Sequence, residues 1–266
     1  MKIWYQSMAP VARLPNYRKS LAAKALVASD GRIEAFVNGV REERYKGRLP
    51  ADVHKYPYAK LVLQLDAIEF GMQAEKEGHA AYVIGSFSEP FLTETRSVLG
   101  IPVVSLAEAA LLAACALGER FALVTLSAEY ARRLRLVVRR HGLESRLTNV
   151  YATSRPMDEG DVERAFAAPA ALIDDVTTIA RRATGEGADV IIPAEGLLSE
   201  VLAQNRVTTI DQATIIDCVG AAVLHADFLI QAQRRLGMHV GRRWGYAKPP
   251  ADLLADLRPQ SREEME

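Results

Sequence analysis

The stretches YVIGSFSEPFL (residues 82–92) and VIIPAEGLL (residues 190–198) decide the fold, because they are two copies of one strand and turn. In each copy a Glu-Gly pair precedes the apolar strand, and a polar residue, Ser86 or Glu195, follows it. An amphipathic helix, a short β-branched strand (residues 101–105 and 207–210) and an Ala-rich helix come next in both copies. This internal repeat predicts two similar units, with Ser86 and Glu195 on opposite walls of a cleft.

Strand-like and helix-like runs alternate outward from the two copies. The periodicity predicts further strands at residues 3–5, 33–37, 121–125 and 148–151, and helices at residues 17–28, 58–76, 128–141 and 162–183. Alternating apolar strands and helices predict an α/β fold with parallel sheets covered by helices on both faces. Residues 32–57 carry mixed charge, glycines and a proline, which indicates a strand followed by a mobile loop over the site.

The composition of the chain indicates which classes of partner and which cellular location to expect. The chain has 266 residues, and its 33 basic and 33 acidic residues give a net charge of zero, which argues against nucleic-acid or acidic-membrane partners. The arginines of residues 132–140 fit the solvated face of a helix. Only two cysteines occur, in no metal or redox spacing, and the longest apolar run, residues 106–117, is too short to span a bilayer. With no signal peptide visible at Met1, we expect a soluble, cytoplasmic protein.

The carboxyl ends of the predicted strands indicate where a ligand binds. In open α/β sheets, ligands lie beyond these ends, where helix N-termini offer free amide groups to a carboxylate or carbonyl oxygen. The rule selects residues 5–7, 85–87, 125–127 and 194–196. His54, in the loop over the site, could reach the same cleft. Neither a metal-binding His and carboxylate spacing nor a glycine-rich nucleotide loop is present in the sequence.

At these residues the chain resembles the aspartate/glutamate/hydantoin racemase superfamily, and most of all its hydantoin-racemase-like branch. The matching segments are a strand ending in Gln6-Ser7, residues 82–92, IPVVSLAEAAL (101–111), FALVTL (121–126), residues 190–198 and GYAKPP (245–250). The resemblance implies two pseudo-symmetric α/β lobes with the active-site cleft between them. Residues 1–117 plus 222–266 would form the first lobe, and residues 118–221 the second. It also implies a small-molecule substrate, no cofactor and a homo-oligomer.

The sequence departs from the family at both catalytic positions. Members that racemise their substrates use one cysteine at the end of each central strand, whereas Ser86 and Ala194 stand at those positions here. A serine hydroxyl is a far weaker acid than a thiol, whose reference pKa is about 8.5, so we do not expect the two-thiol mechanism. Ser86 is either natural or an engineered replacement of a cysteine, and the sequence leaves both open.

The candidate catalytic residues are Glu195 and Ser86. Glu195 could be the sole base, with a pKa raised by burial, or could only favour a helix dipole. Ser86 could donate a hydrogen bond to an enolate oxygen, act as a nucleophile, or be an inert turn residue. Glu89 could cap a helix or take part in catalysis. The predicted substrate-binding residues are Gln6, Ser7, His54, Phe87, Thr125, Ser127, Ala194 and Gly196.

Three functions follow from these residues. The first is a racemase or isomerase acting by non-cysteine chemistry at an activated carbon of a small carboxylate or a cyclic, hydantoin-like amide. The second is a hydrolase or lyase that opens a cyclic amide with Glu195 or Ser86. The third is a small-molecule-binding protein that has lost catalysis.

Overall fold

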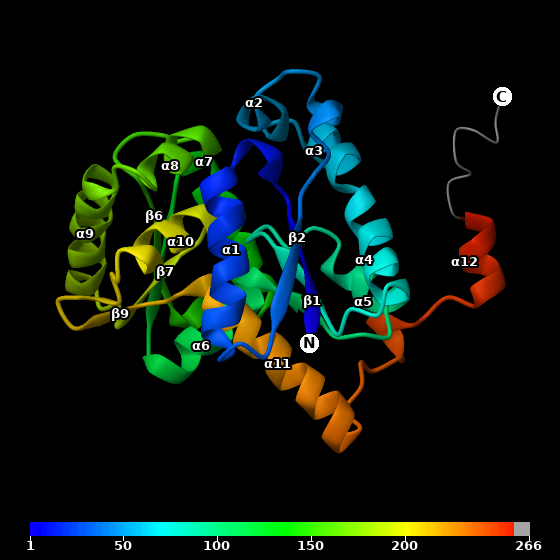
Figure 1. Ribbon diagram of the computed structural model, residues 1–266. Coiled ribbons are helices and arrows are strands. Elements are labelled where there is room, and N and C mark those ends of the chain that lie inside the picture. Colours follow the sequence, from blue (N-terminus) through cyan, green and yellow to red (C-terminus); the bar gives the residue numbers. More distant parts are fainter. Residues whose placement is uncertain (258–266) are drawn as a thin grey trace.

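Two sheets, each flanked by helices, make up residues 1–257, the part of the chain that the computed structural model describes (Figure 1). The first sheet has the strand order β2-β1-β3-β4, and the second has the order β6-β5-β7-β9-β8. The strands are β1 Lys2–Ser7, β2 Glu34–Asn38, β3 Tyr82–Gly85, β4 Val103–Ser105, β5 Phe121–Thr125, β6 Leu147–Ala152, β7 Val190–Pro193, β8 Thr209–Ile210 and β9 Ala213–Ile215. This confirms the predicted α/β fold with two lobes.

The internal repeat covers both lobes from end to end. In the strand orders β2 matches β6, β1 matches β5, β3 matches β7 and β4 matches β9, so the repeat begins earlier than the sequence indicates. All residues of β3, β5 and β7 are buried, as expected for central strands with helices on both faces. The helices in and around the lobes are α1 Pro15–Ala28, α4 Asp66–Lys76, α5 Leu92–Val98, α6 Leu106–Leu117, α7 Ala128–Arg140, α8 Glu159–Ala165, α9 Ala170–Gly185, α10 Gly196–Gln204 and α11 Cys218–Leu236.

Three predicted elements differ from the structure. The helix expected at residues 58–76 is two helices, because one residue, Leu65, separates α3, Pro57–Gln64, from α4. The helix expected at residues 162–183 is divided into α8 and α9, with Pro169 just before α9. In the second copy, β9 is the strand that pairs with β7, whereas residues 207–210 hold only the short β8. The β8 and β9 strands pair antiparallel, so the second sheet is not wholly parallel.

The segment between β2 and α4 contains more regular structure than the predicted mobile loop. It holds the 3-10 helix η2, Glu42–Tyr45, and two helices, α2, Pro50–His54, and α3. Figure 1 shows α2 and α3 at one end of the molecule, beyond the sheets. We call residues 39–64 the lid.

The lobes meet through helices α6 and α11, which pack against each other. Helix α6 begins directly after β4, and α11 begins shortly after β9. Each has a side-chain N-cap: Ser105 accepts from the Glu108 amide and Asp217 from the Gly220 amide. Helix α11 also contacts β3 and β4 of the first sheet. These contacts support the assignment of residues 222–257 to the first lobe, which stays a prediction; residues 258–266 lie outside the described residues.

The chain after α11 runs along the first lobe. The 3-10 helix η4, Trp244–Tyr246, packs on α5, where the Tyr246 hydroxyl accepts from Arg96 Nη1 at 3.3 Å. Helix α12, Ala251–Leu257, stands apart from the sheets (Figure 1). The remaining 3-10 helices are η1 Val11–Arg13 and η3 Glu144–Arg146. Within residues 1–257 no helix has the length and apolar character needed to cross a membrane.

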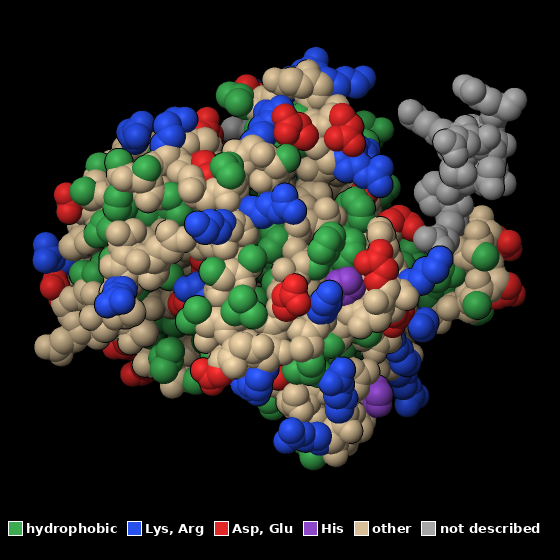
Figure 2. Space-filling view, viewed as in Figure 1, with side chains coloured by type: hydrophobic (Ala, Val, Ile, Leu, Met, Phe, Trp, Pro, Cys, Tyr) green, Lys and Arg blue, Asp and Glu red, His purple; other side chains and the backbone are tan. Residues whose placement is uncertain are grey.

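Charges of both signs are mixed on the surface. On the face shown in Figure 2, Lys and Arg side chains alternate with Asp and Glu, and no continuous basic stripe crosses the lobes. The mixed charges on this face agree with the net charge of zero.

Candidate active site

A cavity of about 450 Å³ lies where the carboxyl ends of the central strands of both lobes meet the lid. Its volume is in the range of small-molecule sites. Seven of the predicted site residues line it: Ser7, His54, Ser86, Phe87, Ser127, Glu195 and Gly196. The cavity therefore lies at the strand ends, where the sequence predicted a ligand to bind. The role of each lining residue stays a prediction.

The other three predicted binding residues do not line the cavity. Gln6 is buried, and its side-chain oxygen accepts from Trp4 Nε1 at 3.1 Å and from Asn38 Nδ2 at 2.9 Å. Ala194 is fully buried, and its amide donates to the Val124 carbonyl at 2.7 Å. Thr125 is also buried, and its hydroxyl donates to Glu195, as described next.

Glu195 is the carboxylate at the end of β7. It occupies the N-cap position of α10, but its side chain makes no capping hydrogen bond. Its Oε1 accepts from the Thr125 hydroxyl at 2.8 Å instead. Burial raises the pKa of Glu195 to about 8, and neighbouring Glu159 adds to the rise, while the Thr125 hydrogen bond and Lys60 oppose it. A carboxyl with this pKa can both take and return a proton near neutral pH.

Ser86 follows β3 and is surrounded by hydroxyl groups. Its Oγ lies 3.0 Å from Ser88 Oγ and accepts from the Ser88 amide at 3.2 Å. The Tyr130 hydroxyl bonds to Ser86 and Ser88, and burial keeps the pKa of Tyr130 well above its ordinary value. Within the described residues no imidazole or carboxylate is hydrogen-bonded to Ser86, so this site offers proton donors rather than an activated nucleophile.

The lid brings positive charge to the cavity. Lys60, on α3, lies with its Nζ 5.8 Å from the centroid of the Tyr130 ring. Burial and Arg133 lower the pKa of Lys60 to about 8, and Glu195 partly offsets the change. Burial, Lys60 and Arg133 lower the pKa of His54 to about 4, so this imidazole is neutral at physiological pH. Its Nε2 is 2.9 Å from the Tyr45 hydroxyl.

Two tyrosines form the floor beneath the cavity. The hydroxyls of Tyr5, on β1, and Tyr17, on α1, lie 3.4 Å apart. A Cβ atom at Gly196 would lie 2.3 Å from the Tyr17 hydroxyl, and one at Gly85 would lie 2.8 Å from the Tyr5 hydroxyl. Both strand ends therefore need glycine at these positions, because any side chain would collide with a buried ring.

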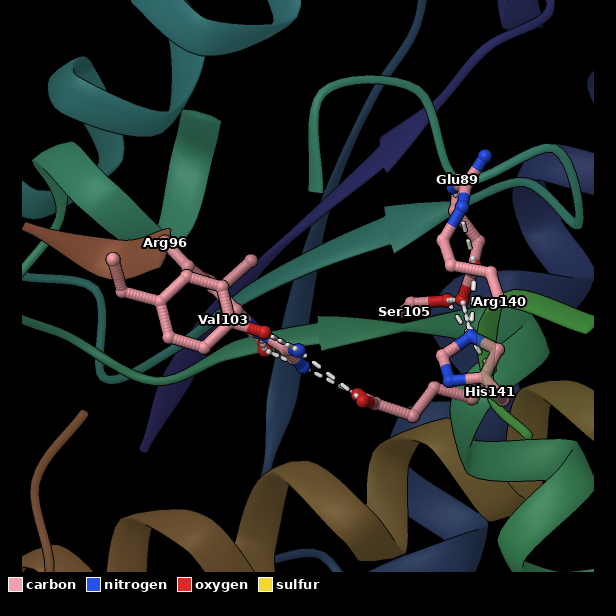
Figure 3. A network of polar contacts seen from close by, with 8 residues as sticks. Glu89, Arg96, Val103, Ser105, Arg140 and His141 are labelled. Carbon is pink, nitrogen blue, oxygen red and sulfur yellow. Dashed lines mark hydrogen bonds and ion pairs between the residues drawn. The ribbon is translucent and has the colours of Figure 1, made fainter. Parts of the chain in front are cut away.

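Glu89 lies outside the cavity lining and joins the two lobes (Figure 3). Its buried carboxylate accepts from the Ser105 hydroxyl, lies 2.8 Å from His141 Nε2 and 3.8 Å from an Arg140 nitrogen. The hydrogen bond to Glu89 raises the pKa of His141. Glu89 does not cap a helix, as the sequence suggested it could, because α5 begins without any side-chain cap. The carboxylate instead ties the turn after β3 to the end of α7.

Several cavity residues are missing from the predicted set. Lys60, Tyr130, Glu159 and Arg133 all line the cavity. Tyr130 lies one helical turn after Ser127, the N-cap of α7. This spacing could have indicated that Tyr130 reaches the same cavity as Ser127. Among the arginines of residues 132–140, Arg133 is half-buried and lines the cavity, whereas Arg140 is exposed although it lies 3.8 Å from Glu89. Among residues 1–257 no group of His, Cys, Asp and Glu side chains could hold a metal ion.

Comparison with known proteins agrees with this arrangement. Residues 51–226, well over half of the chain, match the family described as Asp/Glu/Hydantoin racemase. A hydantoin racemase from Pseudomonas sp. (strain NS671) is 33% identical over 115 residues, a stretch that covers 43% of this chain and 45% of that protein, so the chain spans less than half of its length.

Two solved structures share the fold over nearly the whole chain. Allantoin racemase from Pseudomonas fluorescens has a TM-score of 0.74 at 21% identity, covering 98% of this chain and 99% of that one. Allantoin racemase from Klebsiella pneumoniae has a TM-score of 0.73 at 19% identity, with 94% of both chains covered. With the family match, the paired lobes and the cavity between their central strands, the chain belongs to the Asp/Glu/hydantoin racemase family.

Proposed function

We propose that the protein racemises a small cyclic amide of the hydantoin type, with Glu195 as a base that moves the proton of the acidic ring carbon. The observation that carries this proposal is the Glu195 carboxyl, which faces the cavity from the end of β7 with a pKa of about 8. The names of the hydantoin and allantoin racemases that the chain resembles supply the substrate class. We expect no cofactor, as the family resemblance implies.

The cavity has the groups that such a reaction needs. When the carbon–hydrogen bond breaks, its electron pair moves toward the adjacent ring carbonyl and charge develops on that oxygen. The first turn of α10 lines the cavity at Gly196 and Leu197, and amide groups in a first turn have no partner within their helix. These amides and the Tyr130 hydroxyl are donors that can stabilise the enolate oxygen. The hydrolase route in which Ser86 attacks the ring has no base hydrogen-bonded to Ser86 among the described residues.

The test is incubation of the protein in deuterated water with single enantiomers of 5-substituted hydantoins and of allantoin. We expect one deuterium at the acidic carbon and loss of optical rotation, both faster than in buffer alone. The rate should rise with pH toward about 8, because only the ionised Glu195 is a base.

Glu195→Gln should lower racemisation by about 10²–10⁴-fold, and Glu94→Gln, on the exposed start of α5, is the matched control. Full activity in Glu195→Gln would contradict the assignment of the base. Addition of water to the ring would move the protein to the hydrolases, and a ligand-induced rise in melting temperature without exchange would indicate a binding protein. The homo-oligomer and the cytoplasmic location stay predictions.

A further inference from the structure

Lys60 is a lysine that faces a candidate reaction centre without an ion-pair partner. Lys24, a half-buried lysine of α1, contacts Asp217 at 2.6 Å and Glu200 at 3.7 Å. Lys55, in the lid, lies 3.6 Å from Asp52. Among residues 1–257, Lys60 forms no such ion pair and projects into the cavity beside the Tyr130 ring. An unpaired amine in a protein cavity is available for chemistry.

Lys60 and Glu195 approach the cavity from separate parts of the chain. Glu195 stands at the carboxyl end of β7 in the second lobe, whereas Lys60 is on α3 of the lid. Tyr130 connects the two, because it lies under the Lys60 amine and also feels the charge of Glu195. A ring bound in the cavity can therefore contact Lys60 on the lid and Glu195 at the strand end.

The first lobe offers no competing acid or base at its strand end. Ser86 contacts only hydroxyl groups and an amide in the described residues, and Tyr130 keeps its proton because burial raises its pKa. Glu89, the nearby acid, is engaged by His141 and Ser105. His54 is neutral and bonded to Tyr45. Glu159 also lines the cavity, but it begins α8 in the second lobe, the lobe that carries Glu195. Racemisation needs a second proton-transfer group, and Lys60 is the amine that faces the cavity from the lid.

We propose that Lys60 is the second acid–base residue of this site and transfers protons on the face of the substrate carbon opposite to Glu195. This inference rests on the proposed racemase function. It assigns one half of the catalytic pair to the lid rather than to the strand end of the first lobe.

The proposed step balances without any further reagent. The Glu195 carboxylate takes the proton as the carbon–hydrogen bond breaks, and the electron pair moves into the enolate. The Lys60 ammonium then gives a proton to the opposite face, where the returning electron pair forms the new carbon–hydrogen bond. The site is left with a carboxylic acid and a neutral amine, which is the protonation state that serves the mirror-image substrate.

The acidities of the two groups support this assignment. The pKa values of Glu195 and Lys60 are both about 8, so the carboxylate–ammonium state and the acid–amine state differ little in free energy. Both states hold the same number of protons, and one serves each enantiomer. A racemase must run in both directions, and closely matched acid and base groups allow this.

The deciding experiment follows each enantiomer separately in deuterated water, using L- and D-5-benzylhydantoin. Wild-type protein should exchange and racemise both. Lys60→Met should lower racemisation at least 100-fold, yet one enantiomer should still gain deuterium with retained configuration, because Glu195 can remove and return a proton on one face. Glu195→Gln should show the opposite pattern, with exchange retained only for the other enantiomer.

Two further variants separate proton transfer from binding and folding. Lys60→Arg keeps the positive charge but cannot act as a base, because the pKa of arginine is above about 12; it should fail in the direction that needs a neutral amine. Lys46→Met removes an exposed lysine of the lid that does not line the cavity and should behave as wild type.

Three outcomes would overturn the inference. Wild-type racemisation by Lys60→Met would remove Lys60 from the reaction. An equal loss of exchange for both enantiomers in that variant, or full activity in Lys60→Arg, would make Lys60 a binding residue. If wild-type protein exchanges neither enantiomer of this hydantoin or of the proposed panel, the proposed function itself fails, and that result is distinguishable because it precedes any variant.

Discussion

Two acidic side chains, Glu89 and Glu195, lie in the turns after the central strands of the two lobes, and their surroundings differ completely. Glu89 is bonded to Ser105 and His141 and lies near Arg140. Glu195 accepts from the Thr125 hydroxyl, lies near the charges of Glu159 and Lys60, and forms no ion pair within the described residues. The same residue type thus joins the lobes in one copy of the repeat and is a candidate base in the other.

The comparison teaches that the partners of a carboxylate decide its role. A buried carboxylate with a cationic partner gains from staying ionised, and removal of either member leaves an uncompensated charge. A buried carboxyl without such a partner keeps its proton to a higher pH and becomes useful for proton transfer. The following predictions test whether the two turns differ in this way.

The largest effect should come from exchanging each carboxylate for its amide. Glu89→Gln should destabilise the protein by about 3 kcal/mol, since His141 and Arg140 lose their buried partner. Glu195→Gln should instead leave the protein more stable than wild type above about pH 8. The folded-state pKa of Glu195 exceeds its unfolded value, so between pH 4.5 and about 8 the folded state holds the extra proton, and wild-type stability falls as pH rises through this window.

Urea unfolding at about pH 6 and about pH 9 measures the free energy of unfolding of the wild type and of both variants. Glu94→Gln, exposed at the start of α5, is the control for amide substitution. Equal destabilisation by Glu89→Gln and Glu195→Gln at both pH values would mean that the two carboxylates are structurally alike, and the comparison would break.

An intermediate effect is expected when Glu195 loses its hydrogen bond. Thr125→Val keeps the shape of the side chain but removes the hydroxyl that donates to Glu195. Because that bond lowers the pKa of Glu195, the variant should shift the acid limb of the rate profile to higher pH. A shift of one pKa unit corresponds to about tenfold less activity at neutral pH, with recovery in more alkaline buffer. An unshifted profile would mean that another group sets this limb.

The smallest effect is expected at the end of β3. Ser86→Ala removes a hydroxyl whose partners are Ser88 and Tyr130, and Tyr130 remains as a donor. We expect kcat to fall by less than about tenfold, which is below the 10²–10³ typical of a lost oxyanion donor. Steady-state kinetics on the hydantoin panel would measure this. A loss of 10³-fold would give Ser86 a central role and make the two strand ends chemically equivalent.

The fold and the place of the site follow from local sequence signals. The two apolar strands with their polar turns were sufficient to predict the repeat, the lobes and the position of Ser86 and Glu195 at one cavity. The hairpin at β8 and β9 was missed, because its turn residues, Asp211 and Gln212, adopt positive φ without a glycine to mark the turn. The break between α3 and α4 was also missed, because Leu65, the residue between them, keeps helical backbone angles.

The partners of the site residues could not be predicted in the same way. Lys60 and Glu159 lie on helices that reach the cavity only through tertiary packing, and neither belongs to a strand end. The contact between Glu89 and His141 joins residues 52 positions apart from different lobes. Single-sequence reasoning has no access to such pairs, and here they distinguish a structural carboxylate from a candidate base.

The tyrosine floor beneath the cavity limits how this protein could be redesigned. Tyr5 and Tyr17 occupy the space that any side chain at positions 85 or 196 would need, so substitutions there would disturb the packing between the lobes. The lid has no such restriction, because Lys55 is exposed and His54 and Lys60 are half-buried. Libraries that seek new substrates should therefore vary the lid positions other than Lys60 and keep both glycines. Substitutions in the lid can thus change specificity while Tyr5 and Tyr17 keep the backbone at Gly85 and Gly196 in place.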